Sequence, residues 1–343
     1  MLSRERIVDL LQRVQGLRVG VAGDFCLDRY GAGHVEGQSR ETGRSIVRIT
    51  EHLFCPGGAA NVAWNVAALG AKCAALTVIG ADAFGEMLRN ALRERGVDTG
   101  PMVLDPTRLT PSFEKIKVHD GDRTREDRWD VVNRRPIPSE AERRYINALE
   151  SAAAELDCLI VADYDEAGSG IITPRALERI REIGRRSRLR VLATSRQRIG
   201  AFCPSVAVVN EYEAVVAHGV AGANPFEAAD AALLDEAGAS LARKNGRTAF
   251  VTLGKAGIAV FEPDGRRERA PTVEARGEID IVGAGDTALA AIAVFLCAGT
   301  TPVEAAMLGN IAANVTVRKV GITGAASPQE ILQSYDTFFS GQV

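Results

Sequence analysis

Short apolar segments of strand character alternate with helical segments along most of this chain. The expected strands are residues 17–24, 72–80, 157–164, 188–194, 206–210, 247–254 and 257–263. Helices are expected over 1–16, 57–70 and 84–96, from Pro174 onwards, and over most of 285–338. Strands that are apolar along their whole length need cover on both faces. The alternation therefore predicts an α/β fold with a central, mainly parallel sheet between helical layers.

Two segments interrupt this alternation. Residues 30–55 and 111–132 are strand-like, but polar residues occupy alternate positions. Such a pattern fits a small exposed sheet that stands off the main body. The first segment follows the Gly-Asp pair at 23–24, so we expect this sheet to act as a lid over a cleft; the alternative is a purely structural role. We expect residues 1–343 to form one domain with the lid segments inserted in it.

Composition argues against several classes of function. The formal net charge of the 343 residues is −3, so a nucleic acid is not an expected partner. The six cysteines form no CxxC pair and the four histidines show no zinc-site spacing, which favours free thiols. No apolar run approaches the roughly 20 residues of a membrane span, and the charged amino terminus is unlike a signal peptide. We therefore expect no membrane partner and a cytoplasmic location.

The segment IVGAGDTALAA, residues 281–291, joins an apolar strand end, two glycines and one acid to a helix of small residues. The N-terminus of a helix presents unpaired N–H groups and a partial positive charge. Glycines before it allow the backbone to approach a ligand closely. The turn can therefore bind an anion, most simply a phosphate, beside Asp286.

Three interpretations of this turn compete. Asp286 can be a helix cap, worth about 1 kcal/mol. Gly283, Gly285 and Ala288 fit a dinucleotide pattern, but Asp286 next to a pyrophosphate would cost about 4 kcal/mol at about 4 Å. In the third, the N–H groups of Gly283, Ala284 and Gly285 stabilise a transferring phosphoryl group while Asp286 takes the proton of an attacking hydroxyl. The sequence has no Walker A motif, so a kinase would bind phosphate by another route.

Four motifs in order resemble the ribokinase-like (PfkB) carbohydrate kinases. They are PGGAANVAWNVAALGA from residue 56, NEYE at 210–213, VTLGKAG at 251–257 and DIVGAGDTALAAIAVFLCAG from residue 280. Within the family, VAGDFCLDRYGAG at 21–33, EKIKV at 114–118 and RWD at 128–130 resemble the heptose-7-phosphate kinases. The resemblance implies a three-layer sandwich with a β-sheet lid. It also implies transfer of the γ-phosphate of ATP to a hydroxyl of a sugar or sugar phosphate, with heptose 7-phosphate one candidate. The nucleotidyltransferase half of the bifunctional members is not expected.

The resemblance also implies roles for individual residues. Asp286 would be the catalytic base, with Gly283, Ala284 and Gly285 as the anion hole. The residues implied to bind sugar hydroxyls are Asp28, Gly57, Gly58 and Asn61. Those implied to lie on the side of ATP and Mg²⁺ are Asn210, Glu213, Thr252, Gly254, Gly257 and Asn310. Asp280, the backbone of Val282 and Gly321 resemble a site for a monovalent cation such as K⁺. The structural alternatives are a solvated acid and a helix start for the sugar residues, and surface polar groups for Asn210 and Glu213. They are turn residues for the rest of the nucleotide group, and a strand-end acid for Asp280.

Two basic residues of the lid segments, Lys115 and Arg128, are candidates to bind the phosphate of a phosphorylated sugar, since such a substrate needs a basic clamp. The alternative is that they are exposed lid charges. By resemblance we also expect a homodimer formed through the lid, whose edges and apolar face would otherwise stay uncovered.

Two segments depart from the heptose kinases. The chain has DYDEAG at 163–168 where those kinases usually carry DYAKG, and TSRQ at 194–197 where they carry DPK. Arg196 can replace a lost cation, whereas Thr194 cannot replace an acid. These departures keep a second hypothesis open, a protein of the same fold that senses a sugar or nucleotide without turnover. The intact GAGD turn favours the enzyme.

Overall fold

A nine-stranded sheet lies at the centre of the computed structural model, which describes residues 2–339 except 167, 187, 188, 221, 226, 228, 271, 273, 274 and 276. Its strands are, in spatial order, β15 (Arg267–Ala270), β14 (Ile258–Phe261), β13 (Ala249–Thr252), β12 (Val206–Asn210), β11 (Arg190–Ser195), β10 (Cys158–Asp163), β1 (Arg18–Gly23), β4 (Lys72–Leu76) and β6 (Val97–Asp98). Only the pairings of β14 with β13 and with β15 are antiparallel in this sheet. The prediction of a mainly parallel sheet is confirmed.

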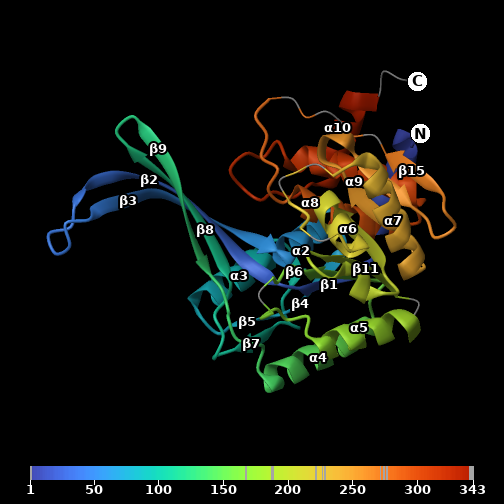
Figure 1. Cartoon of the computed structure of the whole chain (residues 1–343), viewed down its shortest axis with the longest axis horizontal. Helices are drawn as coiled ribbons and strands as arrows, with labels where there is room; N and C mark the ends of the chain where they lie inside the picture. Colours follow the sequence, from blue (N-terminus) through green and yellow to red (C-terminus); the bar gives the residue numbers. More distant parts are fainter. Residues whose placement is uncertain are drawn as a thin grey trace.

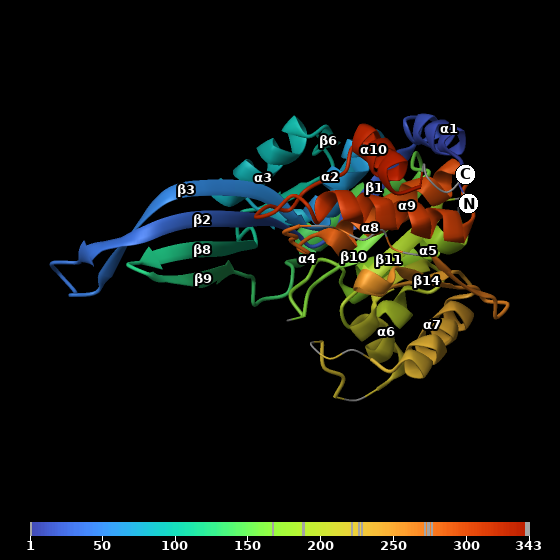
Figure 2. The same ribbon diagram turned by 90° about the horizontal axis from the view of Figure 1, so that it is seen from above.

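Helices cover both faces of this sheet, and each face has its own hydrophobic core (Figure 2). One core includes side chains of α1 (Arg4–Val14), α2 (Ala59–Ala68), α3 (Ala83–Glu94), α8 (Ala284–Ala298), α9 (Pro302–Thr316) and α10 (Pro328–Phe339). The other includes side chains of α4 (Ser139–Ala153), α5 (Pro174–Arg186), α6 (Glu211–His218) and α7 (Ala231–Asn245). The α8 helix is apolar on nearly every side, as expected for a helix packed between other elements. The expected three-layer sandwich is therefore present.

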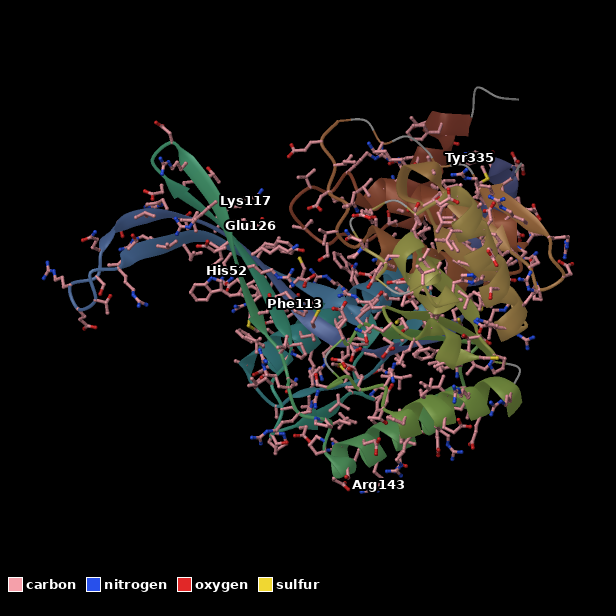
Figure 3. The ribbon with its side chains drawn as sticks, in the orientation of Figure 1. His52, Phe113, Lys117, Glu126, Arg143 and Tyr335 are labelled. Carbon is pink, nitrogen blue, oxygen red and sulfur yellow. The ribbon has the colours of Figure 1, made fainter. Side chains whose placement is uncertain are left out.

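The lid is a separate four-stranded sheet that projects from the body as an arm (Figure 1). Its strand order is β3 (Ser45–Gly58), β2 (Phe25–Gln38), β8 (Ser112–Asp120) and β9 (Arg123–Val131). The second segment agrees with the predicted range 111–132, whereas β2 and β3 extend beyond 30–55. Lys117 and Glu126 lie further out along this arm than Phe113 (Figure 3).

The predicted helix over 57–70 begins too early, because Gly57 and Gly58 complete β3 and α2 starts at Ala59. Gly58 has φ +54°, and a Cβ atom there would lie 2.8 Å from the carbonyl oxygen of Asp24. A residue with a side chain would be strained at this strand-to-helix turn. The pair of glycines therefore makes a tight junction between lid and body.

Other boundaries also differ from the predicted ones. The predicted strand 72–80 divides into β4 and β5 (Val78–Gly80), and β5 pairs with β7 (Val103–Asp105) in a third, two-stranded sheet. The predicted strand 247–254 ends at Thr252, and the short helix η2 (Gly254–Ala256) follows it. A second short helix, η1 (Ile199–Phe202), precedes β12. Of the predicted segments, positions 1, 167 and 188 lie outside the described residues.

Candidate active site

A cleft of about 960 Å³ lies between the lid and the carboxyl ends of the parallel strands. This edge of an open α/β sheet is where ligands usually bind. The predicted site residues in its wall are Asp28, Gly58, Lys115, Arg128, Asn210, Glu213, Thr252, Val282, Gly283, Gly285 and Asp286. Most of the predicted site therefore comes together in one cavity, although it derives from distant parts of the sequence.

Asp286 lies half-buried in the first turn of α8 and is held by two side chains. The hydroxyl of Tyr164 donates to its Oδ1 at 2.5 Å, and the amide Nδ2 of Asn61 donates to its Oδ2 at 3.0 Å. Burial raises the pKa of Asp286, while these two hydrogen bonds and the positive charge of Arg196 act in the opposite direction. Each carboxylate oxygen keeps acceptor capacity, so Asp286 can still receive a proton from the cleft.

The glycine turn before Asp286 leaves little space for a side chain. Gly283 is the N-cap of α8 with φ +80°, and a Cβ atom there would lie 2.7 Å from Nδ2 of Asn61. The N–H of Ala284 donates to the carbonyl of Ile281 at 3.2 Å, so one of the three predicted anion-hole amides is engaged within the turn. Gly283 and Gly285 line the cleft. The turn can therefore present backbone N–H groups to an anion next to the carboxylate.

Asp28 lies on the lid side of the cleft, on β2. Burial and the charge of Asp286 raise its pKa to about 6, although Lys115 and Arg128 oppose the shift. A Cβ atom on Gly57 would lie 2.5 Å from the carboxyl carbon of Asp28, so this glycine leaves the space that Asp28 occupies. A carboxyl group of this kind can accept hydrogen bonds from sugar hydroxyls.

Lys115 and Arg128 are cross-strand neighbours on β8 and β9, and both face the cleft. The ammonium of Lys115 lies 5.7 Å from the ring centre of Tyr30. Arg128 is exposed and its Nε donates to Asp130 at 2.9 Å. The two cations are therefore placed where a phosphorylated substrate under the lid would meet them, and their role stays a prediction.

Asn61 is fully buried beneath Asp286. Besides its bond to Asp286, its Oδ1 accepts a hydrogen bond from Nδ2 of Asn65 at 3.2 Å. Both ends of the amide are thus used inside the protein. The contact of Asn61 with a sugar stays a prediction, and the two hydrogen bonds direct this side chain toward the carboxylate and the interior.

Asn210 and Glu213 form the capping box of α6 at the end of β12. The side chain of Asn210 accepts from the N–H of Glu213 at 2.8 Å, and Oε2 of Glu213 accepts from the N–H of Asn210 at 3.0 Å. Glu213 is 8% exposed, and burial raises its pKa to about 7. The N-x-x-E spacing is itself a known helix-start pattern, so it has a local structural role as well as a place in the cleft.

The other predicted nucleotide residues divide into two groups. Thr252 lines the cleft, and its hydroxyl donates to the carbonyl of Val209 at 3.3 Å. Among the described residues, Gly254, Gly257 and Asn310 are not part of the cleft wall. Gly254 and Gly257 form the turn between β13 and β14, and Nδ2 of Asn310 donates to the carbonyl of Ala270 at 3.1 Å. Their nucleotide contacts remain predictions.

The three residues predicted for a monovalent cation lie together. Oδ1 of Asp280 accepts from the N–H of Val282 at 3.0 Å, and Oδ2 accepts from the N–H of Gly321 at 3.1 Å. Oxygen atoms are the ligands that hard cations prefer, and this loop supplies a carboxylate among backbone groups. Within the described ranges, no three His, Cys, Asp or Glu residues form a metal-type cluster.

Two residues with prominent contacts, Tyr164 and Asp24, are not among the predicted site residues. Tyr164 follows β10 and binds Asp286. Asp24 follows β1, and its carboxylate accepts three backbone N–H groups, from Tyr164 at 2.9 Å and from Asp165 and Ile171 at 3.1 Å each. Burial raises the pKa of Asp24 to about 6. Their positions in the sequence could have indicated them, because both residues directly follow a buried parallel strand, where ligand sites usually lie.

Arg196, which follows β11, is the cation noted among the departures. Its Nη1 lies 2.9 Å from Oε1 of Glu166, and its guanidinium lies 5.5 Å from the ring centre of Tyr164. It lines the cleft beside Asp286 and Glu213. The two departures from the family pattern are therefore in contact with each other.

An α/β sheet with a lid, a cleft at its carboxyl edge and an acid beside a glycine turn is an arrangement that fits a phosphotransferase of the sugar-kinase class. The chain belongs to the pfkB family of carbohydrate kinases, whose family model matches residues 34–330. It is accordingly a carbohydrate kinase, and the family is ATP-dependent.

Two similar proteins share one name. The chain is 33% identical over 333 residues to the bifunctional protein HldE of Geotalea uraniireducens, a match that covers 96% of this chain and 65% of the relative. It is 32% identical over 338 residues to the bifunctional protein HldE of Trichlorobacter lovleyi, with 96% and 65% covered. The chain thus spans about 65% of the length of these relatives.

Solved structures share the fold at low identity. Escherichia coli phosphofructokinase-2 in complex with substrates and products gives a TM-score of 0.70 at 17% identity, covering 94% of this chain and 99% of that one. Arabidopsis thaliana ribokinase complexed with ribose and ATP gives 0.68 at 17% identity, covering 93% and 98%. The ribokinase-like fold is therefore established. None of the helices among the described residues combines the length and the apolar character that a membrane span requires.

Proposed function

We propose that this kinase transfers the γ-phosphoryl group of ATP to a hydroxyl of a phosphorylated sugar, with Asp286 as the general base. The supporting observation is the position of Asp286, which lies in the cleft beside the Gly283–Gly285 turn and opposite Asp28. Asp28 would hold acceptor hydroxyls, together with the backbone of Gly57 and Gly58. The acceptor hydroxyl would then stand between the base and the anion-binding turn.

In the proposed reaction, the acceptor oxygen forms a bond to the γ-phosphorus while the bond from that phosphorus to the bridging oxygen of ADP breaks. The hydroxyl proton passes to Asp286. Backbone N–H groups of the glycine turn stabilise negative charge on the moving phosphoryl group. The lid keeps water out of the cleft, which protects ATP from hydrolysis.

The proposed acceptor is a sugar phosphate because Lys115 and Arg128 face the cleft from the lid. Charged donors of this kind form strong hydrogen bonds to phosphate. The lid and amino-terminal motifs resemble heptose-7-phosphate kinases, and the similarity to the HldE proteins points the same way. Heptose 7-phosphate is therefore the first acceptor to test.

Metal ions have two proposed places. Mg²⁺ takes oxygen ligands and keeps several waters. One oxygen of Glu213 and the amide oxygen of Asn210 are engaged in the capping box, so the fit is through the second Glu213 oxygen and water. Bound Mg²⁺ would neutralise phosphate charge. K⁺ would bind at the loop of Asp280, Val282 and Gly321.

The test measures ADP release from Mg-ATP with a panel of hexoses, pentoses and heptose 7-phosphate. We expect turnover with a phosphorylated acceptor and a loss of about 10²–10⁴-fold in kcat for Asp286→Asn. Turnover by Asp286→Asn equal to the unchanged protein would remove the proposed base. Ligand binding by calorimetry without phosphoryl transfer to any acceptor would instead favour the sensing protein.

A further inference from the structure

Tyr164 makes the shortest side-chain contact to Asp286, and the reaction described above assigns it no role. Its hydroxyl lies 2.5 Å from Oδ1 of Asp286. A phenol that donates to a carboxylate stabilises the charged form of that carboxylate. The bond also fixes the rotation of the carboxyl group, because Asn61 donates to the other oxygen.

Tyr164 is itself held in place by the end of β1. Its backbone N–H donates to Oδ2 of Asp24 at 2.9 Å, and Asp24 also binds the N–H groups of Asp165 and Ile171. The ring of Tyr164 lies close to Gly58, where a Cβ atom would approach its Cδ2 to 3.4 Å. These contacts leave the phenol little freedom to turn away from Asp286.

The chemistry of Tyr164 limits what it can do. Burial and the neighbouring charge of Asp286 raise the pKa of the phenol far above its ordinary value. The hydroxyl therefore stays protonated and acts as a donor, and it cannot take the proton of a substrate in place of Asp286. The guanidinium of Arg196, 5.5 Å from the ring centre, packs against the aromatic face.

We propose that Tyr164 is a positioning residue that orients the carboxylate of Asp286 toward the acceptor hydroxyl and keeps it ionised. The proposal rests on the proposed function, since it requires Asp286 to be the base. Asp24, at the end of β1, holds the backbone of Tyr164, and the phenol of Tyr164 in turn holds Asp286 on α8. Tyr164 thus couples the central strands to the catalytic turn.

The experiment compares Tyr164→Phe with the unchanged kinase and with Tyr145→Phe. Tyr145 is a matched control, because it is fully buried and its hydroxyl has no hydrogen-bond partner among the described residues. For Tyr164→Phe we expect kcat to fall about 10- to 100-fold, as for a lost bond to a charged group. The KM for ATP should stay within about twofold, since the ATP contacts are unchanged.

The pH dependence of kcat distinguishes a role of Tyr164 in positioning Asp286 from a general disturbance of the structure. Without the phenol, Asp286 takes up a proton more readily, so the acid limb of the profile should move to higher pH. The other titratable or charged groups facing Asp286 are Cys26 and Asp28 on β2, Glu213 on α6 and Arg196 after β11. They are the same in both proteins. Replacing Tyr164 with 3-fluorotyrosine, a stronger donor of the same shape, should move the limb to lower pH.

The outcomes distinguish this proposal from the proposed function. If Asp286→Asn is inactive while Tyr164→Phe keeps the kcat and acid limb of the unchanged kinase, the positioning role is wrong and the base stands. A fall in kcat for Tyr164→Phe with an unmoved limb, and no shift with 3-fluorotyrosine, also overturns it. If Asp286→Asn keeps full turnover, the proposed function itself fails.

Discussion

The floor of the cleft, by which we mean Asp286 and the Gly283–Gly285 turn with the side chains that contact them, differs from the lid in how its side chains are held. On the floor, Asp286 is fixed by Tyr164, Asn61 and the tight turn at Gly283. In the lid, large apolar side chains stay exposed, among them Ile46, Leu53 and Trp129, at 44%, 44% and 63%. Internal contacts therefore fix the side chains of the floor, whereas several large apolar side chains of the lid remain exposed to solvent.

This difference indicates where substitutions should affect activity most. A carboxylate that must act as a base at one point needs neighbours that fix its orientation and charge. A lid must admit and release substrate, and the two cations that we propose to bind it, Lys115 and Arg128, lie on lid strands and face the cleft. Small changes on the floor should therefore affect turnover strongly, and changes in the lid should affect substrate choice or assembly.

Among changes that keep Asp286 itself, the largest expected effect comes from one methyl group on the floor, in Gly283→Ala. The added Cβ would lie 2.7 Å from Nδ2 of Asn61 and should push that amide off Asp286. We expect kcat to fall about 10²–10³-fold. Gly299→Ala is the matched control at the other end of α8. It also replaces a left-handed glycine, with φ +99°, and so carries a similar backbone penalty.

Kinetics and thermal unfolding of the two variants test this contrast. Both should lose stability by about 1–2 kcal/mol, while only Gly283→Ala should lose turnover. Equal kcat values in the two variants would show that the floor is less constrained than its contacts indicate.

An intermediate effect is expected from Arg128→Ala in the lid. Losing a charged donor to phosphate should lower kcat/KM for a phosphorylated acceptor about 10- to 100-fold. The same measurement with an unphosphorylated sugar should change little. Arg125→Ala on the same strand is the control, since Arg125 is also exposed and paired with an acid, Asp127, but is not in the cleft wall. An equal loss with both sugars would contradict a phosphate contact.

The sequence predicted those features that depend on local pattern. The parallel sheet follows from strand and helix periodicity, and the position of Asp286 beside a phosphate-type turn follows from four adjacent residues, Gly283 to Asp286. These features can be predicted because each of them depends on residues that are close together in the sequence. The lid strands were found for the same reason, from their two-sided polarity.

The remaining features depend on contacts between distant residues. Tyr164 and Asp286 are 122 residues apart. A tyrosine that follows a strand belongs to no sequence pattern that would indicate which residue it contacts. The strand assignment of Gly57 and Gly58 is not evident from the sequence because the residues that pack against them, Asp24 after β1 and Asp28 on β2, are distant in the sequence. The capping box of Asn210 and Glu213 was different, since its spacing is local and only its structural meaning was overlooked.

The smallest expected effect on the chain itself comes from Trp129→Ser on the exposed edge strand of the lid. We propose that the lid pairs with a second copy, because open strand edges and exposed apolar groups favour association. Light scattering should give twice the 36.5 kDa chain mass for the unchanged protein and a shift toward monomer for the variant. Its stability as a monomer should change by about 0.5 kcal/mol or less. Leu109→Ser, exposed to 51% outside the lid strands, should stay dimeric; a monomer at all concentrations for the unchanged protein would refute the lid contact.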